Sequence, residues 1–240
     1  MKVLVVAAHP DDEVYGMGGT MAKLAAQGHE VHVLIVTDGC TAQYADRPDL
    51  PRIIKRKRDE ALEANQLLGV QQVHFGIFPD MRLDTVPHVE VNRLIEETVD
   101  AVQPKAVYTH FYGDVNLDHQ MVYRSTLVAV RPVPGQCVRE LYCYRVPSST
   151  EWSPQLGHTV FLPNVMTDIS GFEDVKERAL LAYQTEARAY PHPRSPRYIR
   201  ETDQARGLEW GLGPAEAFWL LRKIKGAYHE KTHMDHTTMP

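Results

Sequence analysis

The chain has 240 residues, of which 43% are hydrophobic, so it is long enough to bury one sizeable core. Its formal net charge is -5, and no basic stripe stands out of the kind that a general nucleic-acid-binding protein needs. The cysteines Cys40, Cys137 and Cys143 form no CxxC pair, which argues against a disulfide framework and favours a reducing compartment.

The N-terminal sequence MKVLVVAAHPDDE has only a short apolar run before a dense acidic cluster. A signal peptide needs a longer apolar stretch with a cleavage site, and a membrane span needs about 20 apolar residues. We therefore expect a cytoplasmic protein without a membrane span.

Strands and helices are expected to alternate from the N-terminus onward. Residues 3–8 form a continuous apolar run, which is typical of a strand buried on both faces. Residues 18–27 have helical character and end at Gly28, and residues 31–37 form a second buried-strand run. Residues 40–51 are polar with two prolines, which predicts a loop.

The middle of the chain continues the alternation. Helices are predicted at residues 53–68, 89–102 and 117–130, and strands at 73–75 and 106–110. Towards the C-terminus, the pattern predicts strands at 138–144 and 158–162 and helices at 172–184 and 214–225. Residues 190–200 are rich in proline and arginine, so no regular element is expected there.

This order of elements predicts an α/β fold, with a Rossmann-like, doubly wound and mostly parallel sheet flanked by helices in three layers. We expect one domain over residues 1–240. Within it, residues 1–130 would be the βαβ core, 131–228 the C-terminal strands and helices, and 229–240 a polar tail.

Ionisable residues crowd together directly after the first predicted strand, at His9, Asp11, Asp12 and Glu13. In open α/β sheets the ligand site lies beyond the carboxyl ends of the strands, which is where this loop falls. An acidic turn that caps the next helix would explain one acid. It would not explain a histidine with three acids, a group that needs a cation or solvent to balance it.

Glycines at 16, 18 and 19 raise the alternative of a dinucleotide site. Their spacing is not GxGxxG after the strand, and the acids occupy the place where a pyrophosphate needs bare backbone N–H groups. The glycines are better explained by a tight turn and close packing.

A second polar cluster, THFYGDVNLDH at residues 109–119, follows another predicted buried strand. Parallel strands bring their carboxyl ends to one edge, so the two clusters should face each other there. Two histidines and a carboxylate with one open position form a known kind of catalytic metal site, which acidifies water to a pKa near ~7. Alone, His119 would more often be structural; with the first cluster, a metal site is favoured.

The motifs AHPDDE at 8–13 and NLDH at 116–119 resemble those of the LmbE-like (PIG-L) family of metal-dependent N-acetyl-sugar deacetylases. The second family motif is usually HxxDH. The resemblance covers roughly residues 1–130, including the charged helix that ends in Leu-Gly-Val at 68–70 and the Pro79-Asp80 loop. Later segments, such as Tyr-Gln-Thr-Glu at 183–186, are less diagnostic.

The resemblance implies roles for four residues. His9, Asp12 and His119 would bind the metal, and Asp11 would act as the general base on the attacking water. Zinc is the default ion for this ligand set, although ferrous iron is an alternative, and no organic cofactor is expected. Asp11 could later pass its proton to the leaving amine.

One position departs from the family pattern, because Asn116 stands where the family usually has histidine. Asparagine can donate a hydrogen bond but cannot transfer a proton, so the acid role falls to Asp11, His110 or His192. Asp118, which could orient such a histidine, would lose that role too.

Further polar residues are expected near the rim, where they could grip sugar hydroxyls or a phosphate, although each could equally be an ordinary surface residue: Arg58, Asp80, Asp114 and Arg194. The basic run at 55–58 fits a solvated or substrate-facing helix turn better than a nucleic-acid patch. The histidines at 229, 233 and 236 have metal-like spacing in a polar tail, where we expect no specific role.

Taken with the resemblance, these features predict a zinc-dependent hydrolase that removes an N-acetyl group from a small sugar-like molecule, such as an amino sugar or a nucleotide- or lipid-linked sugar. One alternative is an amidase that acts on a larger acyl or thiol conjugate. Another is a non-catalytic Rossmann-like binding protein, which would bind no metal and tolerate Asp11→Asn. The expected partner is a small acetamido substrate, with no nucleic acid; a homo-oligomer is left open.

Overall fold

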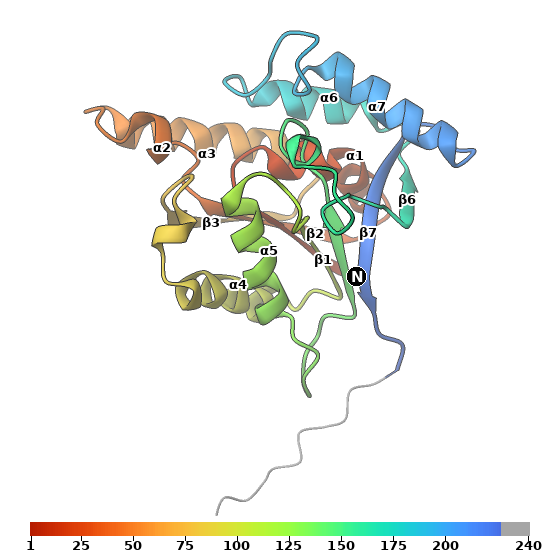
Figure 1. Ribbon diagram of the computed structural model, residues 1–240, viewed down its shortest axis with the longest axis horizontal. Coiled ribbons are helices and arrows are strands. Elements are labelled where there is room, and N and C mark those ends of the chain that lie inside the picture. Colours follow the sequence, from red (N-terminus) through yellow and green to blue (C-terminus); the bar gives the residue numbers. More distant parts are fainter. Residues whose placement is uncertain (227–240) are drawn as a thin grey trace, which may run out of the picture.

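The computed structural model describes residues 1–226, which form one seven-stranded sheet with helices on both faces (Figure 1). The strands are β1 Lys2–Ala7, β2 Glu30–Thr37, β3 Gln72–Phe78, β4 Ala106–His110, β5 Glu140–Tyr144, β6 Val165–Asp168 and β7 Ala215–Lys223. The helices are α1 Asp12–Ala26, α2 Thr41–Tyr44, α3 Leu50–Leu67, α4 His88–Val102, α5 Leu117–Ala129, α6 Glu173–Ala182 and α7 Pro196–Glu209, with 3-10 turns η1 Leu83–Thr85 and η2 Thr150–Trp152.

The strand order is β3-β2-β1-β4-β5-β7-β6. The first five strands in this order are parallel, and β7 runs antiparallel to both β5 and β6. The chain winds outward from β1 to β3 and then crosses to β4 on the other side of β1, which makes a topological switch point between β1 and β4. Ligands of doubly wound sheets bind outside the carboxyl ends at this point.

Side chains of the central strand β1 pack into two hydrophobic cores. Val3 and Val5 pack on the side covered by α1, α3 and α6, whereas Leu4 and Val6 pack on the side covered by α4 and α5. All four are completely buried, so the sequence prediction of a strand enclosed on both faces is confirmed, as is the mostly parallel α/β fold. Burial of each such side chain stabilises the fold by about 1.5–3 kcal/mol.

Two sequence predictions fail near the C-terminus. The predicted helix at 214–225 is wrong, because Ala215–Lys223 is strand β7. Its alanines, leucines and glutamate favour a helix, but pairing with strands on both sides and burial of Phe218 outweigh that weak preference. The predicted strand at 158–162 is also wrong, since β6 begins only at Val165.

Two segments expected to be irregular contain helix. The prediction that 190–200 contains no regular element is wrong for residues 196–200, because α7 begins at Pro196. The Ser195 hydroxyl accepts the Tyr198 N–H at 3.2 Å and proline occupies the first turn, a combination that marks a helix start. In the predicted loop 40–51, the short helix α2 forms, and α3 already begins at Leu50.

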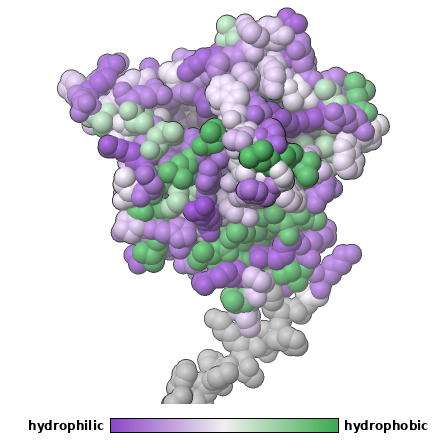
Figure 2. All heavy atoms as spheres, in the orientation of Figure 1, coloured by the Kyte–Doolittle hydropathy of each residue, from purple (hydrophilic) through white to green (hydrophobic). Residues whose placement is uncertain are grey.

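The visible face carries hydrophilic residues over most of its area, with hydrophobic residues gathered in its lower centre (Figure 2). Among residues 1–226, no helix has the length and apolar character needed to cross a membrane. The histidines at 229, 233 and 236 lie outside the described residues.

Candidate metal centre

The loop after β1 is held against the turn after β2. Gly39 has a φ of +67°, and a Cβ atom at this position would come within 2.4 Å of the Pro10 ring. Thr37 donates to the Ala8 carbonyl both from its backbone N–H at 3.0 Å and from its hydroxyl at 2.8 Å. Only glycine allows so close an approach in this backbone conformation, and it fixes His9 and Asp12 at the switch point.

Three side-chain atoms converge there. The distances are 3.1 Å from His9 Nδ1 to Asp12 Oδ2, 3.2 Å from His9 Nδ1 to His119 Nε2, and 3.3 Å from His119 Nε2 to Asp12 Oδ2. With bonds of about 2.0–2.1 Å and tetrahedral angles, two ligands of one zinc ion lie roughly 3.3 Å apart. The donor set and its spacing therefore fit a single divalent ion.

Electrostatics within the group suit metal binding. Burial alone would raise the pKa of Asp12, but His119, His9 and His110 hold it well below its usual range. Burial alone would lower the pKa values of both His9 and His119, yet Asp12 raises that of His9 well above normal, and Asp12 with Asp114 raises that of His119 to about 9. A bound metal ion would supply the positive charge instead, and the imidazoles would release their protons.

Each candidate ligand imidazole has a carboxylate at its other nitrogen. His9 Nε2 lies 3.1 Å from Asp118 Oδ2 and 3.4 Å from Asp80 Oδ1, and His119 Nδ1 lies 3.2 Å from Asp114 Oδ2. His9, Asp80 and Asp118 also have metal-like spacing. Because this second group uses the other nitrogen of His9, we interpret its carboxylates as groups that orient the ligand.

Further contacts hold these carboxylates in place. Asp118 Oδ1 accepts the Leu83 N–H at 3.0 Å. Asp114 accepts hydrogen bonds from the Asn116 N–H at 2.8 Å, from the Thr150 hydroxyl at 2.7 Å and from Ser149. The Asp114 carboxylate therefore contacts His119, whereas the sequence suggested a place at the rim of the site.

His110 is completely buried behind the centre. Its Nε2 accepts the Ala8 N–H at 2.8 Å, and its ring stacks on that of His119 with centroids 4.0 Å apart. Burial and the nearby His119 hold its pKa well below the usual value, so the ring is neutral. It supports the first loop and does not line the cavity described below.

Asp11 belongs to a chain of charged groups. Its Oδ2 lies 3.3 Å from Arg194 Nη1, which is 3.1 Å from Glu186 Oε2, and Glu186 is paired with Lys57. Burial raises the pKa of Asp11 well above its ordinary value, against the opposing effect of Arg194. A carboxyl group with a raised pKa is better able to hold a proton in the middle of a reaction.

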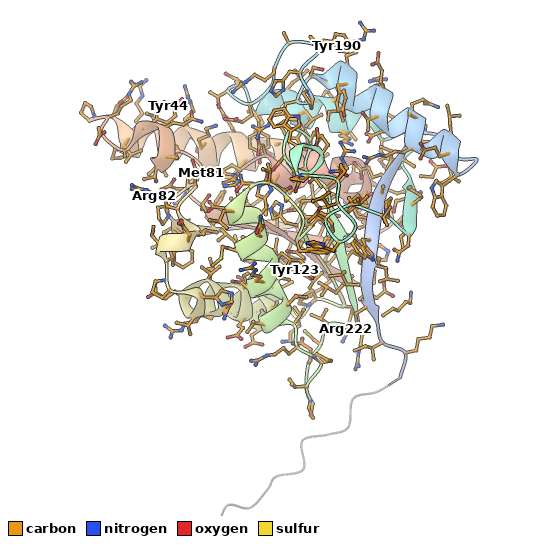
Figure 3. The ribbon with its side chains drawn as sticks, viewed as in Figure 1. Tyr44, Met81, Arg82, Tyr123, Tyr190 and Arg222 are labelled. Carbon is orange, nitrogen blue, oxygen red and sulfur yellow. The ribbon has the colours of Figure 1, made fainter. Side chains whose placement is uncertain are left out.

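A cavity of about 90 Å³ opens beside these groups. Its lining residues come from six segments of the chain: His9, Pro10, Asp11, Gly39, Lys57, Asp80, Met81, Asn116, Glu186 and Arg194. Met81, labelled in Figure 3, lies beside the amino end of α5 and accepts a hydrogen bond from Asn116 Nδ2 at 3.3 Å. Asn116 Oδ1 accepts the Asp118 N–H at 2.9 Å, so Asn116 also caps α5.

Two residues proposed from the sequence lie elsewhere. Arg58 lies over the Phe75 ring and donates to the Gly76 carbonyl, away from the cavity. His192 accepts the Arg194 N–H and sits edge-on to Trp152, and it does not line the cavity either.

Sequence reasoning did not single out Glu186, and it included Lys57 only in the run at 55–58 that was expected to be solvated or substrate-facing. Lys57 falls at helical spacing from the buried Ile53 and Ala61, so it lies on the inner face of α3 rather than with the solvated run around it.

Comparisons with known proteins identify the family of the chain. Residues 4–130 match the PIG-L family, described as GlcNAc-PI de-N-acetylase. The chain is 30% identical over 228 residues to "Probable N-acetyl-alpha-D-glucosaminyl L-malate deacetylase 2" of Bacillus cereus, covering 92% of this chain and 97% of that protein. It is 27% identical over 192 residues to the diacetylchitobiose deacetylase of Thermococcus kodakarensis, covering 77% and 70% of the two chains.

Among solved structures, a conserved protein of Thermus thermophilus superimposes with a TM-score of 0.72 at 25% identity. The superposition covers 94% of this chain and 96% of that one, so the whole described fold, and not only the motif-bearing half, has a known counterpart.

Proposed function

The chain belongs to the PIG-L family and is a deacetylase of N-acetyl-sugar substrates, and we propose that it uses a zinc ion to hydrolyse the acetamido group of a small amino-sugar derivative. The observation that carries the proposal is the convergence of His9 Nδ1, Asp12 Oδ2 and His119 Nε2 to within 3.1–3.3 Å of one another. When bound there, zinc supplies a Lewis acid for the carbonyl and acidifies water.

The side chains around this point supply the proton transfers. Asp11 takes the proton of the attacking water, and its raised pKa lets it hold that proton and then give it to the amine nitrogen as the C–N bond breaks. Arg194 balances the charge of Asp11 while the carboxylate is ionised. The Asn116 amide faces the cavity and offers an N–H to the oxyanion, because its contact with Met81 sulfur is weak and easily exchanged.

The cavity of about 90 Å³ has room for a two-carbon acyl group, while the sugar extends towards its open mouth. Glu186, Lys57 and Asp80 stand at the wall as partners for sugar hydroxyls.

By their names, one relative is a probable deacetylase of N-acetyl-alpha-D-glucosaminyl L-malate and the other a deacetylase of diacetylchitobiose. We propose the same class of substrate for this chain. Since Glu186 and Arg194 from beyond residue 130 line the cavity with the residues of the N-terminal motifs, we also propose that the chain works as one catalytic unit.

The test combines metal analysis with an acetate-release screen over N-acetylglucosamine, its L-malate conjugate, diacetylchitobiose and nucleotide-linked forms. We expect about one divalent ion per chain and release from at least one compound. Asp11→Asn should keep the ion and lose turnover. Metal-loaded protein that releases acetate from none of the compounds would contradict the proposed function.

A further inference from the structure

The backbone of Asp11 adopts a conformation that non-glycine residues rarely occupy. Its φ is +124° with ψ at -29°. A residue held in such a region costs of order 1–3 kcal/mol, and it persists only where its surroundings impose it. The strain falls on the residue proposed as the general base, so the contacts that impose it bear on the reaction.

Glu13 provides one of these contacts from the first turn of α1. Its Oε2 accepts the Asp11 N–H at 3.2 Å, while its Oε1 accepts hydrogen bonds from Asn65 Nδ2 at 2.9 Å and from the Tyr183 hydroxyl at 2.5 Å. Asn65 lies on α3 and Tyr183 follows α6, so two distant segments of the chain hold one carboxylate. That carboxylate in turn holds the Asp11 peptide.

The burial of Glu13 is unusual for an acid. The residue is 0% exposed, and no lysine, arginine or histidine within residues 1–226 forms an ion pair with it. Placing a carboxylate out of water costs several kcal/mol unless hydrogen bonds replace its hydration. The three donors supply that replacement, and together they leave Glu13 one fixed orientation.

A simpler explanation is that Glu13 favours the start of α1 by its charge, as acids in a first turn do. That effect needs only a carboxylate near the helix end, and Asp12 already provides one. It explains neither the complete burial nor the donors from Asn65 on α3 and from Tyr183 just after α6.

We propose that Glu13, held by Asn65 and Tyr183, is a positioning residue that fixes the strained Asp11 peptide and thereby aims the Asp11 carboxylate into the cavity. The inference rests on the proposed function, in which Asp11 is the base. Loss of the hydrogen bond to Glu13 lets φ of Asp11 relax towards negative values, which swings its side chain. A misplacement of about 1 Å can cost about 100-fold in rate.

Two variants test the contact while preserving its shape. In Glu13→Gln an NH₂ group replaces one of the two carboxylate oxygens. This NH₂ group faces either the Asp11 N–H or the donors of Asn65 and Tyr183, and it cannot accept a hydrogen bond from them. Tyr183→Phe keeps the carboxylate and removes one of its donors, which covers the case in which Glu13→Gln folds poorly. We expect kcat to fall by about 10-fold or more in each, with KM within about twofold of the parent value and one metal ion per chain retained.

Glu216→Gln is the matched control. Glu216 is also buried and accepts the N–H groups of Gly19 at 2.9 Å and Thr20 at 2.7 Å on α1. It also forms an ion pair with Lys176 Nζ at 2.8 Å, and it does not line the cavity. Its kcat, corrected for the folded fraction, should stay within about twofold of the parent value.

Three outcomes would overturn the proposal: unchanged kcat in both test variants, an activity loss that follows metal loss, or an equal loss of kcat in Glu216→Gln. The crystal structure of Glu13→Gln gives a readout that needs no turnover. We expect the Asp11 carboxylate to have moved by about 1 Å or more; an unmoved carboxylate with φ still positive refutes the positioning role. A parent chain that releases no acetate refutes only the proposed function.

Discussion

Replacing Asp118 with asparagine should weaken metal binding by about 10-fold without removing a ligand. Both carboxylate oxygens are in use: Oδ2 lies 3.1 Å from His9 Nε2, and Oδ1 accepts the Leu83 N–H at 3.0 Å. The asparagine amide has one acceptor oxygen and must turn its NH₂ group towards one of these two donors. His9 then loses either the partner that fixes its ring or the anchor of that partner.

The magnitude follows from this geometry. Loss of a hydrogen-bonding carboxylate behind a metal-bound histidine typically costs 10–100-fold in metal affinity, or about 1.4–2.7 kcal/mol. Asp80 Oδ1 stands 3.4 Å from the same nitrogen and can take over part of the role, which places asparagine at the lower end of the range. Asp118→Ala, which removes both acceptors, should approach 100-fold.

The assay is zinc titration by calorimetry against a competing chelator, with circular dichroism to confirm folding. Asp84→Asn serves as the control, because Asp84 is exposed on η1 next to Leu83. A zinc dissociation constant for Asp118→Ala within twofold of the parent value would show that His9 does not depend on this carboxylate, and the assignment of His9 Nδ1 as the ligand atom would fail with it.

Three more outcomes follow. The neighbouring carboxylates raise the pKa values of His9 and His119, that of His119 to about 9, so metal binding below that pH must displace a proton. Zinc affinity should therefore rise with pH up to about pH 9 in titrations over this range; a flat profile would contradict the ligand assignment. Lys57→Met removes a buried cation from the cavity wall and should raise KM by about 10-fold, measured by acetate release, whereas an unchanged KM would remove Lys57 from substrate binding. Gly39→Ala adds a Cβ against Pro10 at a φ of +67° and should lower the free energy of unfolding by about 1–3 kcal/mol in urea titrations; full stability would show that the turn can adjust.

The N-terminal half of the fold could be predicted because its signals are local. The run at residues 3–8 is apolar without interruption, and β1 lies between two cores as that pattern requires. Strand β7 carries no such signal. Its alanines and leucines suit a helix, and only the pairing with β5 and β6, from Asp168↔Ala215 at 47 positions apart to Glu140↔Lys223 at 83, makes it a strand.

The candidate site could likewise be predicted only in part. Because parallel strands end at one edge, His9, Asp12 and His119 were expected together, and the structure brings them together. The role of Asp118 was not foreseen: with Asn116 in place of histidine it was expected to lose its partner, yet it lies beside His9 Nε2. The contact of Glu13 with Tyr183 joins residues 170 positions apart, which no local spacing encodes.

The charges around the imidazoles of His9 and His119 explain why this site favours the binding of a divalent ion. Within a few ångströms lie carboxylates on Asp12, Asp80, Asp114 and Asp118, with Asp11 beyond them, whereas the nearest guanidinium, of Arg194, is shared with Glu186. Such an excess of buried negative charge is stable only with added positive charge. In the metal-free chain the neighbouring carboxylates raise the pKa values of His9 and His119, so protonation of these imidazoles opposes the negative charge. A divalent ion supplies positive charge at the same place, so metal and protons compete for one group of atoms, and the pH dependence of metal binding follows from the geometry that brings the loops together.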